Sequence, residues 1–142
     1  LNVKTTVEEL GVDEKIASFV LPLGMTINMN GTAIMQVIAT LFIAGCAGYS
    51  ISFTQLVVIA LLALIASAGT PAAPGSGAII LFTILSGLGY VNDAAMLAYS
   101  LILAINRPIE MLVTALNVVG DSATSIYVAK SEGALNEDVY NA

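Results

Sequence analysis

Charged side chains are missing from a long stretch of this chain. Asp, Glu, Lys, Arg and His do not occur between Ile16 and Asn92. A soluble domain of 142 residues needs charged groups every few residues to keep its surface in water, yet only 10% of these residues are charged. Together with a mean hydropathy of +0.93, this absence predicts an all-α membrane protein.

Other absences exclude whole classes of function. Without His, and with the single Cys46 in an apolar run, the chain offers neither a disulfide framework nor an obvious transition-metal cluster. The four Lys and Arg residues form no basic patch for nucleic acid. Ser-His and Cys-His catalysis is impossible. An intramembrane aspartyl protease needs two facing aspartates, and Asp121 has no second aspartate at membrane depth.

The few charges gather at the two ends of the chain. The net charge of −6 comes almost entirely from acidic residues in these ends, which we interpret as solvated flanks. Residues 1–15 form an amphipathic lead-in, and residues 130–142 a cytoplasmic tail. Because the chain begins at Leu1 without a cleavable signal pattern, we expect an internal or C-terminal part of a longer protein.

The first apolar segment, residues 16–48, predicts a broken transmembrane helix. Asn28-Met29-Asn30-Gly31 divides it into two runs, each shorter than the roughly 20 residues needed to cross a bilayer. Gly31 relaxes the backbone there, and the Asn side chains can satisfy freed backbone groups. One span interrupted near its middle is the simplest structure.

The second segment, residues 53–90, predicts a re-entrant helical hairpin. Two apolar runs flank residues 67–77, which contain two prolines and three glycines and cannot stay helical between them. Each run of about 12 to 14 residues is about 20 Å long as a helix, against a hydrocarbon thickness of about 30 Å. The alternative is two cramped spans with an outside loop.

The last segment, residues 93–129, is long enough for a full span with a tilt or a break. Four polar residues, Glu110, Thr114, Asn117 and Asp121, follow one another at intervals of 4, 3 and 4, which places them on one helix face. A carboxylate deep in an apolar helix must find a cation or a proton. The alternative is a stripe that only joins helices through hydrogen bonds.

The lysines indicate the orientation of this multi-pass membrane protein. Lys4 and Lys15 precede the first span and Lys130 follows the last, whereas the connections between segments have no Lys or Arg. The positive-inside bias therefore places both termini in the cytoplasm. That requires an even number of crossings, which a re-entrant hairpin between two spans provides.

Three motifs together resemble the sodium-coupled dicarboxylate and amino acid symporters, a family that includes archaeal aspartate transporters and excitatory glutamate transporters. Residues 21–32, ending in Asn28-Met29-Asn30-Gly31-Thr32, resemble the broken seventh helix of the family, whose core is usually Asn-Met-Asp-Gly-Thr. Residues 67–78 resemble the tip of its second re-entrant hairpin, and residues 117–121 with 128–130 the end of its eighth helix. The resemblance covers nearly the whole chain.

The resemblance implies a cation-coupled symporter in which sodium ions are co-transported and no organic cofactor is used. One sodium site would use Gly24, Asn28, Asn117 and the Asp121 carboxylate. A second would lie between Thr26 and the hairpin backbone at Ser67, Ala68 and Thr70. Closure of the hairpin tip would complete this second site, so ion binding would favour the occluded state.

The resemblance also implies a site for a small-molecule substrate and a particular assembly. The substrate would contact the hairpin tip, the final helix and the break in the first span, at Met29, Thr32, Ala73, Pro74, Gly75, Ser76, Gly77, Glu110, Val113, Thr114 and Asn117. The chain would form part of an elevator-type transport domain, lacking the first hairpin and the scaffold. The full-length parent would be a homotrimer in the lipid bilayer of an inner or plasma membrane.

Departures from the family pattern change the expected substrate. The family Asp is Asn30 here, which removes a negative charge near a third sodium site. The eighth-helix Arg that grips an acidic side chain is Val113, and the Asp that meets the substrate amine is Glu110. An acid without a partner Arg favours a neutral amino acid over acidic substrates.

Arg107 leaves this interpretation open, because it lies three residues before Glu110 and could pair with it. If that pair removes the amine partner, the substrate need not be an amino acid. Two further alternatives are a passive pore or uniporter, since broken helices also line channels, and an isolated fragment without activity of its own.

Overall fold

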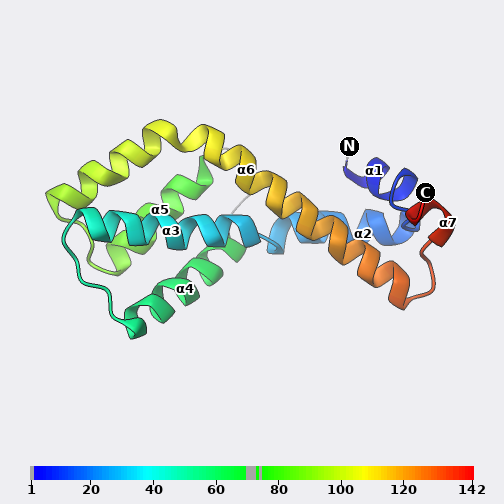
Figure 1. Ribbon diagram of the computed structural model, residues 1–142, viewed down its shortest axis with the longest axis horizontal. Helices are drawn as coiled ribbons and strands as arrows, with labels where there is room; N and C mark the ends of the chain where they lie inside the picture. The colour runs from blue at the N-terminus through cyan, green and yellow to red at the C-terminus, as the bar shows by residue number, and fades with distance from the viewer. Residues whose placement is uncertain (1, 70–72, 74) are drawn as a thin grey trace.

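The computed structural model describes residues 2–69, 73 and 75–142. Within these ranges the chain forms seven α-helices and no strand beyond one isolated bridge. In chain order they are α1 (Asn2–Glu8), α2 (Glu14–Ile27), α3 (Asn30–Cys46), α4 (Phe53–Ala68), α5 (Ser76–Gly87), α6 (Asp93–Ser131) and α7 (Glu137–Tyr140). Figure 1 shows an elongated arrangement in which α2 and α3 follow one another and α6 runs beside both. The prediction of an all-helical chain is confirmed.

The first apolar segment is broken at two residues only. Asn28 and Met29 leave the helical conformation, with φ/ψ of −95°/95° and −121°/44°. The predicted break also included Asn30 and Gly31, but these form the first turn of α3. The Gly31 N–H has no helical partner in that turn, and the Oδ1 atoms of Asn30 and Asn117 each accept from it at 2.8 Å. These bonds let the helix restart early.

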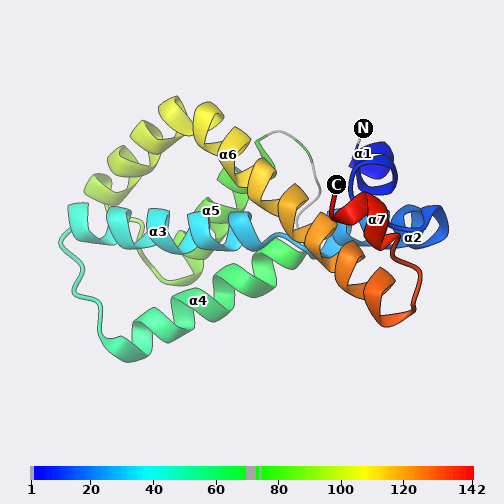
Figure 2. The ribbon, with the colours of Figure 1, turned by 45° about the vertical axis from the view of Figure 1, so that its right-hand side comes forward.

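The second apolar segment forms a hairpin of helices around α3. Helices α4 and α5 contact each other and α3, and their outer ends lie at the same end of the molecule (Figures 1 and 2). A capping box between Ser52 and Gln55 begins α4. Gly75, with φ of +86°, precedes α5 in a left-handed conformation that suits glycine. Ser76 and Gly77 therefore belong to α5, two residues before its predicted start, and the membrane depth of the hairpin stays a prediction.

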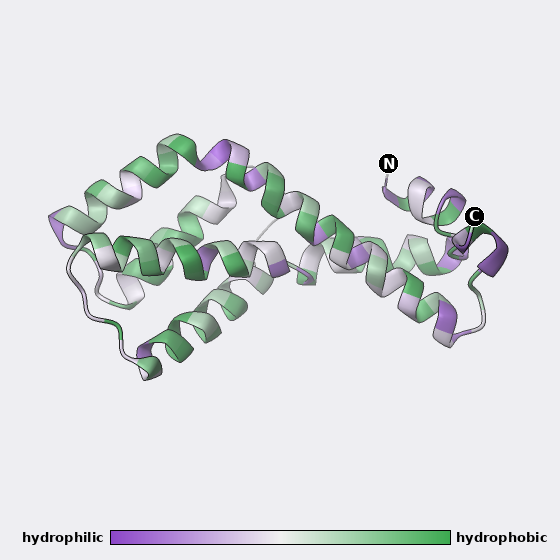
Figure 3. Ribbon diagram, viewed as in Figure 1, coloured by the Kyte–Doolittle hydropathy of each residue, from purple (hydrophilic) through white to green (hydrophobic). Residues whose placement is uncertain are grey.

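Helix α6 is continuous but bent. Its 39 residues give a length of about 58 Å at 1.5 Å per residue, well beyond one hydrocarbon layer. Pro108 lies inside it, and a proline removes one helical hydrogen bond and crowds the preceding turn. Figure 1 shows the bend in the yellow part of α6, and Figure 3 shows a hydrophilic stretch near the same place.

The buried core is small, and much of the apolar surface is exposed. Ile43, Ile59, Leu81 and Leu85 are fully buried where α3 meets α4 and α5. Elsewhere many large apolar side chains face outward, as Figure 3 shows in green. Glu14–Cys46 and Asp93–Ser131 are long and apolar enough to cross a membrane. This exposed apolar surface fits lipid or further protein better than water.

The segments before α2 and after α6 are joined. Val12 forms an antiparallel bridge with Leu135, and the N–H groups of Asp13 and Asn136 donate to the carbonyls of Ala134 and Gly11 at 3.2 and 2.7 Å. Both ends of the chain therefore lie at the same end of the molecule (Figure 1). This arrangement agrees with an even number of crossings, while the side of the membrane stays a prediction.

Candidate functional site

A cavity of about 850 Å³ lies between the break, the middle of α6 and the start of α5. Its walls contain residues from all three of these distant parts of the chain, including most of the predicted substrate residues. The predicted residues in its walls are Met29, Thr32, Ala73, Ser76, Gly77, Glu110, Val113, Thr114 and Asn117. Asn28 and Asp121, predicted for sodium, line the same cavity. Pro74 and Thr70 lie outside the described residues.

Asp121 is the buried carboxylate of this cavity. Its residue is 5% exposed, and Asn28 Nδ2 donates to its Oδ1 at 2.8 Å. The same amide nitrogen lies 3.3 Å from the Asn117 carbonyl oxygen. Among the described residues, no other donor to the carboxylate is recorded. One neutral donor compensates poorly for a buried negative charge, so this carboxylate calls for either a cation or a proton.

Glycines allow the break to lie directly against α6. A Cβ added to Gly24 would collide with Oδ1 of Asp121 and lie 2.9 Å from its Cγ. A Cβ added to Gly120 would lie 2.7 Å from Asn28 Nδ2 and 2.8 Å from Asn30 Nδ2. A larger residue at either position would have to push these polar side chains aside, so the two glycines keep the break and the Asp121 carboxylate close together.

The amide of Asn117 connects the break to the substrate side of the cavity. Its Oδ1 accepts from the Gly31 N–H, and its Nδ2 donates to Thr32 Oγ1 at 3.2 Å. Nδ2 also lies 3.4 Å from the sulfur of the buried Met29. The Met29 sulfur thus contacts both Asn117 and Thr32, and its place between ion and substrate stays a prediction.

Glu110 joins α6 to the start of α5. Its Oε1 accepts from Asn106 Nδ2 at 2.7 Å and from the Gly75 N–H at 3.2 Å. Its Oε2 lies 3.3 Å from Arg107 NH1. The pairing between Arg107 and Glu110 that the sequence left open therefore forms, and Glu110 also holds the start of α5 against α6.

Thr26 and the hairpin residues of the second predicted sodium site are not joined by a hydrogen bond in the part of the chain that the structure describes. Thr26 is exposed, and its hydroxyl donates to the Pro22 carbonyl at 3.2 Å. Ser67 is 1% exposed, and among the residues that the structure describes its hydroxyl has no hydrogen-bond partner. Ala68 is exposed and ends α4. In the described ranges, no bond joins Thr26 to either hairpin residue.

Two polar residues of the site were missed from the sequence. Gln36 is fully buried, and its Nε2 donates to the Gly77 carbonyl at 2.7 Å. Asn106 supports Glu110. Asn106 precedes Glu110 by four residues and extends the polar register of α6 backwards, so its position was detectable. Gln36 carried only one signal, its polarity within an apolar run.

The part of the chain that the structure describes holds no group of three His, Cys, Asp or Glu side chains suited to a metal ion. The donors at the break are instead one carboxylate, amide groups and backbone carbonyls. Oxygen donors of this kind suit hard cations and not zinc or copper.

Comparison with known proteins adds independent information. The sequence model of the sodium:dicarboxylate symporter family matches residues 1–131. An excitatory amino acid transporter of Onchocerca volvulus is 40% identical over 116 residues, which are 81% of this chain and 23% of that protein. Excitatory amino acid transporter 2 of Homo sapiens is 38% identical over 128 residues, which are 88% of this chain and 22% of that protein. The chain spans less than a quarter of these relatives, whose names describe transporters and not enzymes.

Proposed function

Because this chain belongs to the sodium:dicarboxylate symporter family, we propose that it forms part of a secondary active transporter that carries a neutral amino acid together with sodium ions. Asp121 is the observation that supports this most strongly. It is a buried carboxylate with one donor, Asn28, among the described residues, and it lies so close to α2 that a Cβ added to Gly24 would collide with it. A dehydrated sodium ion needs several oxygen ligands, and unwound backbone in transporters supplies them.

In this proposal the first sodium ion binds between the break and α6. Its ligands are the Asp121 carboxylate and carbonyl oxygens of Gly24, Asn28 and Asn117. A second ion binds between Thr26 and the hairpin residues Ser67, Ala68 and Thr70. Among the described residues, the hydroxyl of Ser67 is buried and has no partner, which supports a bound ion at this place. Movement of the hairpin tip would bring Ser67 to Thr26.

The substrate occupies the cavity beside Asn117 and Glu110. Val113 lines that cavity and cannot pair with a side-chain carboxylate, which favours a neutral amino acid over aspartate, glutamate or a dicarboxylate. The hairpin tip, from Ala73 to Gly77, covers the substrate. Glu110 takes the substrate amine in exchange for one of its present donors.

The membrane arrangement follows from the same proposal. The broken segment and α6 cross the bilayer, the hairpin of α4 and α5 is re-entrant, and both ends of the chain face the cytoplasm. The whole unit moves as part of an elevator-type transport domain in a homotrimer. The antiparallel bridge between Val12 and Leu135 supports placing both ends of the chain on the same side of the membrane.

Uptake into proteoliposomes tests the proposal on the full-length protein that contains this chain. Labelled alanine and serine are compared with aspartate and succinate, each with sodium or choline outside. We expect sodium to raise neutral amino acid uptake and to leave the acidic substrates near background. Sodium-dependent uptake of aspartate alone would overturn the assignment of Val113, and equal uptake in choline would overturn sodium coupling.

A further inference from the structure

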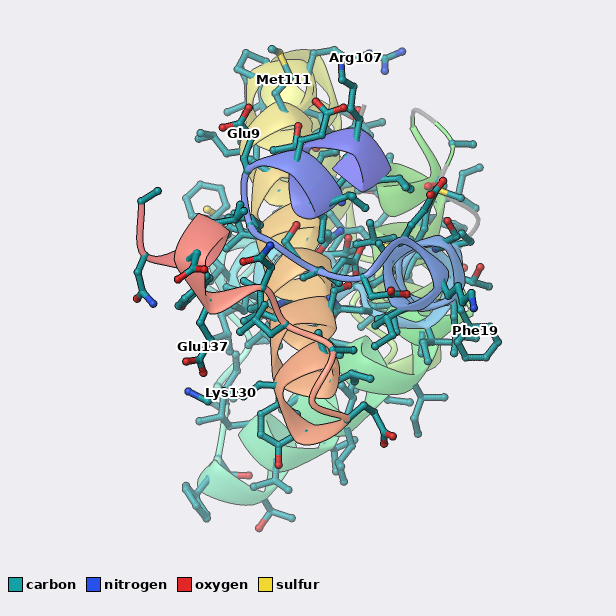
Figure 4. All side chains as sticks on the ribbon, turned by 90° about the vertical axis from the view of Figure 1, so that its right-hand side faces the viewer. Glu9, Phe19, Arg107, Met111, Lys130 and Glu137 are labelled. Carbon is teal, nitrogen blue, oxygen red and sulfur yellow. The ribbon has the colours of Figure 1, made fainter. Side chains whose placement is uncertain are left out.

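Arg107 is an intramembrane charge that the proposed sites do not use. It lies in the apolar helix α6, lines the cavity, and has a side chain that is 72% exposed. Figure 4 shows Arg107 and Met111 at the outer edge of the bend of α6. Charged side chains at membrane depth avoid lipid and face either protein or a water-filled pathway. Its position in the cavity wall places Arg107 where it can contact a bound solute.

The contact between Arg107 and Glu110 is open to exchange. NH1 of Arg107 meets Oε2 of Glu110 at 3.3 Å in a single bond, whereas a guanidinium has five donors and pairs most strongly with a carboxylate through two parallel bonds. Among the described residues, no other acceptor for Arg107 is recorded. A single, largely exposed contact of this kind contributes little free energy.

Glu110 stays in place when this contact opens. Its other oxygen, Oε1, is held by Asn106 and by the Gly75 N–H, so Oε2 remains directed to the same wall of the cavity. Glu110 thus offers a fixed acceptor for an ammonium group. Arg107, three residues earlier on the same helix, offers guanidinium donors for a carboxylate.

From this geometry we propose that Arg107 binds the α-carboxylate of the transported amino acid while Glu110 binds its ammonium group. The zwitterion separates the Arg107–Glu110 pair, and each charge finds an opposite partner, so neither Arg107 nor Glu110 is left unpaired. The substrate side chain then faces the apolar wall at Met29, Met111, Val113 and Val118. This assignment rests on the proposed function and names Arg107 as a specificity-determining residue.

The assignment also changes the meaning of the ion pair. An intrahelical pair that merely cancels the charge of Glu110 would exclude amino acids from the cavity. A pair that a zwitterion can replace favours α-amino acids over amines, amides and simple carboxylic acids, because each of these offers only one of the two charges.

Direct binding to the purified full-length protein tests the role of Arg107 without relying on sodium-driven uptake. Dissociation constants for L-alanine, L-alaninamide and propionate are measured in sodium for the native protein, Arg107→Gln and Arg107→Lys. Because a charged hydrogen bond is worth more than a neutral one, we expect the native protein to prefer alanine over alaninamide by at least about tenfold. Arg107→Gln should reduce that ratio to about one, and Arg107→Lys should keep part of it, since the charge remains without the fork.

A structural role for Arg107 would weaken alanine and alaninamide equally and leave their ratio unchanged, which would overturn the assignment. Absence of any preference for alanine in the native protein would overturn it too, whatever the variants do. A third result would also contradict the assignment: Arg107→Gln could lose aspartate binding while its affinity for neutral ligands stays unchanged. Arg107 would then bind a side-chain carboxylate and not the α-carboxylate. Failure of sodium coupling appears separately, as alanine binding that is the same in sodium and choline.

Discussion

Asn28 donates a 2.8 Å hydrogen bond from Nδ2 to Oδ1 of Asp121, across 93 positions of the sequence. This bond joins the break between α2 and α3 to the polar face of α6. It also identifies the place where the buried carboxylate meets unwound backbone. The proposed first sodium site depends on this contact.

Asp121→Asn should remove the first sodium site. The amide keeps the size of the side chain but loses the charge that attracts the ion, so sodium affinity should fall by at least about tenfold. Sodium binding to the full-length protein is the measurement, with Asp93→Asn as the matched control, since Asp93 is exposed in the first turn of the same helix. Full sodium affinity in Asp121→Asn would remove this site from the account.

Gly24→Ala should weaken the same site through contact alone. The added Cβ collides with the Asp121 carboxylate, and such overpacking costs about 1–3 kcal/mol. We expect a lower melting temperature and a lower sodium affinity. Gly45→Ala is the control, because a Cβ there meets nothing within 4 Å and alanine favours a helix. If Gly24→Ala melts like Gly45→Ala and binds sodium normally, the close approach of α2 to α6 is wrong.

Val113→Arg should extend the substrate range to acidic amino acids. A guanidinium at this position would enter the cavity wall beside Asn117 and could pair with a side-chain carboxylate. Aspartate uptake should rise at least about tenfold, as expected for a new charged pair. Val113→Ala, which adds space without charge, should leave aspartate uptake at background. No gain with arginine would contradict the placement of Val113 in the substrate site.

Gln36→Met should loosen the start of α5 without unfolding the protein. It removes the 2.7 Å bond to the Gly77 carbonyl, while Glu110 still holds Gly75. One hydrogen bond is worth about 1 kcal/mol, so amide exchange in the first turns of α5 should accelerate about two- to tenfold. Gln55→Met changes only the exposed capping box of α4 and serves as control. Unchanged exchange in Gln36→Met would show that this bond does not hold the hairpin.

Local patterns in the sequence predicted the helices well. The prolines and glycines of residues 67–77 separate α4 from α5, and the Asn-Met dipeptide separates α2 from α3. The boundaries near Asn30 and Ser76 were less accurate, because they depend on the distant Asn117 amide and on the left-handed Gly75. Side-chain bonds from elsewhere in the fold decide whether such terminal turns stay helical.

The site was predictable where it follows helical register and unpredictable where it depends on tertiary contact. Intervals of 4, 3 and 4 identified the stripe from Glu110 to Asp121, and a spacing of three indicated the pair with Arg107. The closeness of Gly24 to Asp121 and of Gln36 to Gly77 has no local signal. Both contacts arise only when the break and the hairpin pack on the rest of the chain.

Accumulation of alanine against its own gradient separates a sodium symporter from a passive pore. Proteoliposomes with the full-length protein and no internal alanine are given labelled alanine outside and exposed to an inward sodium gradient that is then abolished with an ionophore. The account predicts that alanine rises above its external concentration and leaves again when the gradient is removed. Uptake that stops at equal concentrations with the sodium gradient intact would contradict a symporter and support a passive pore.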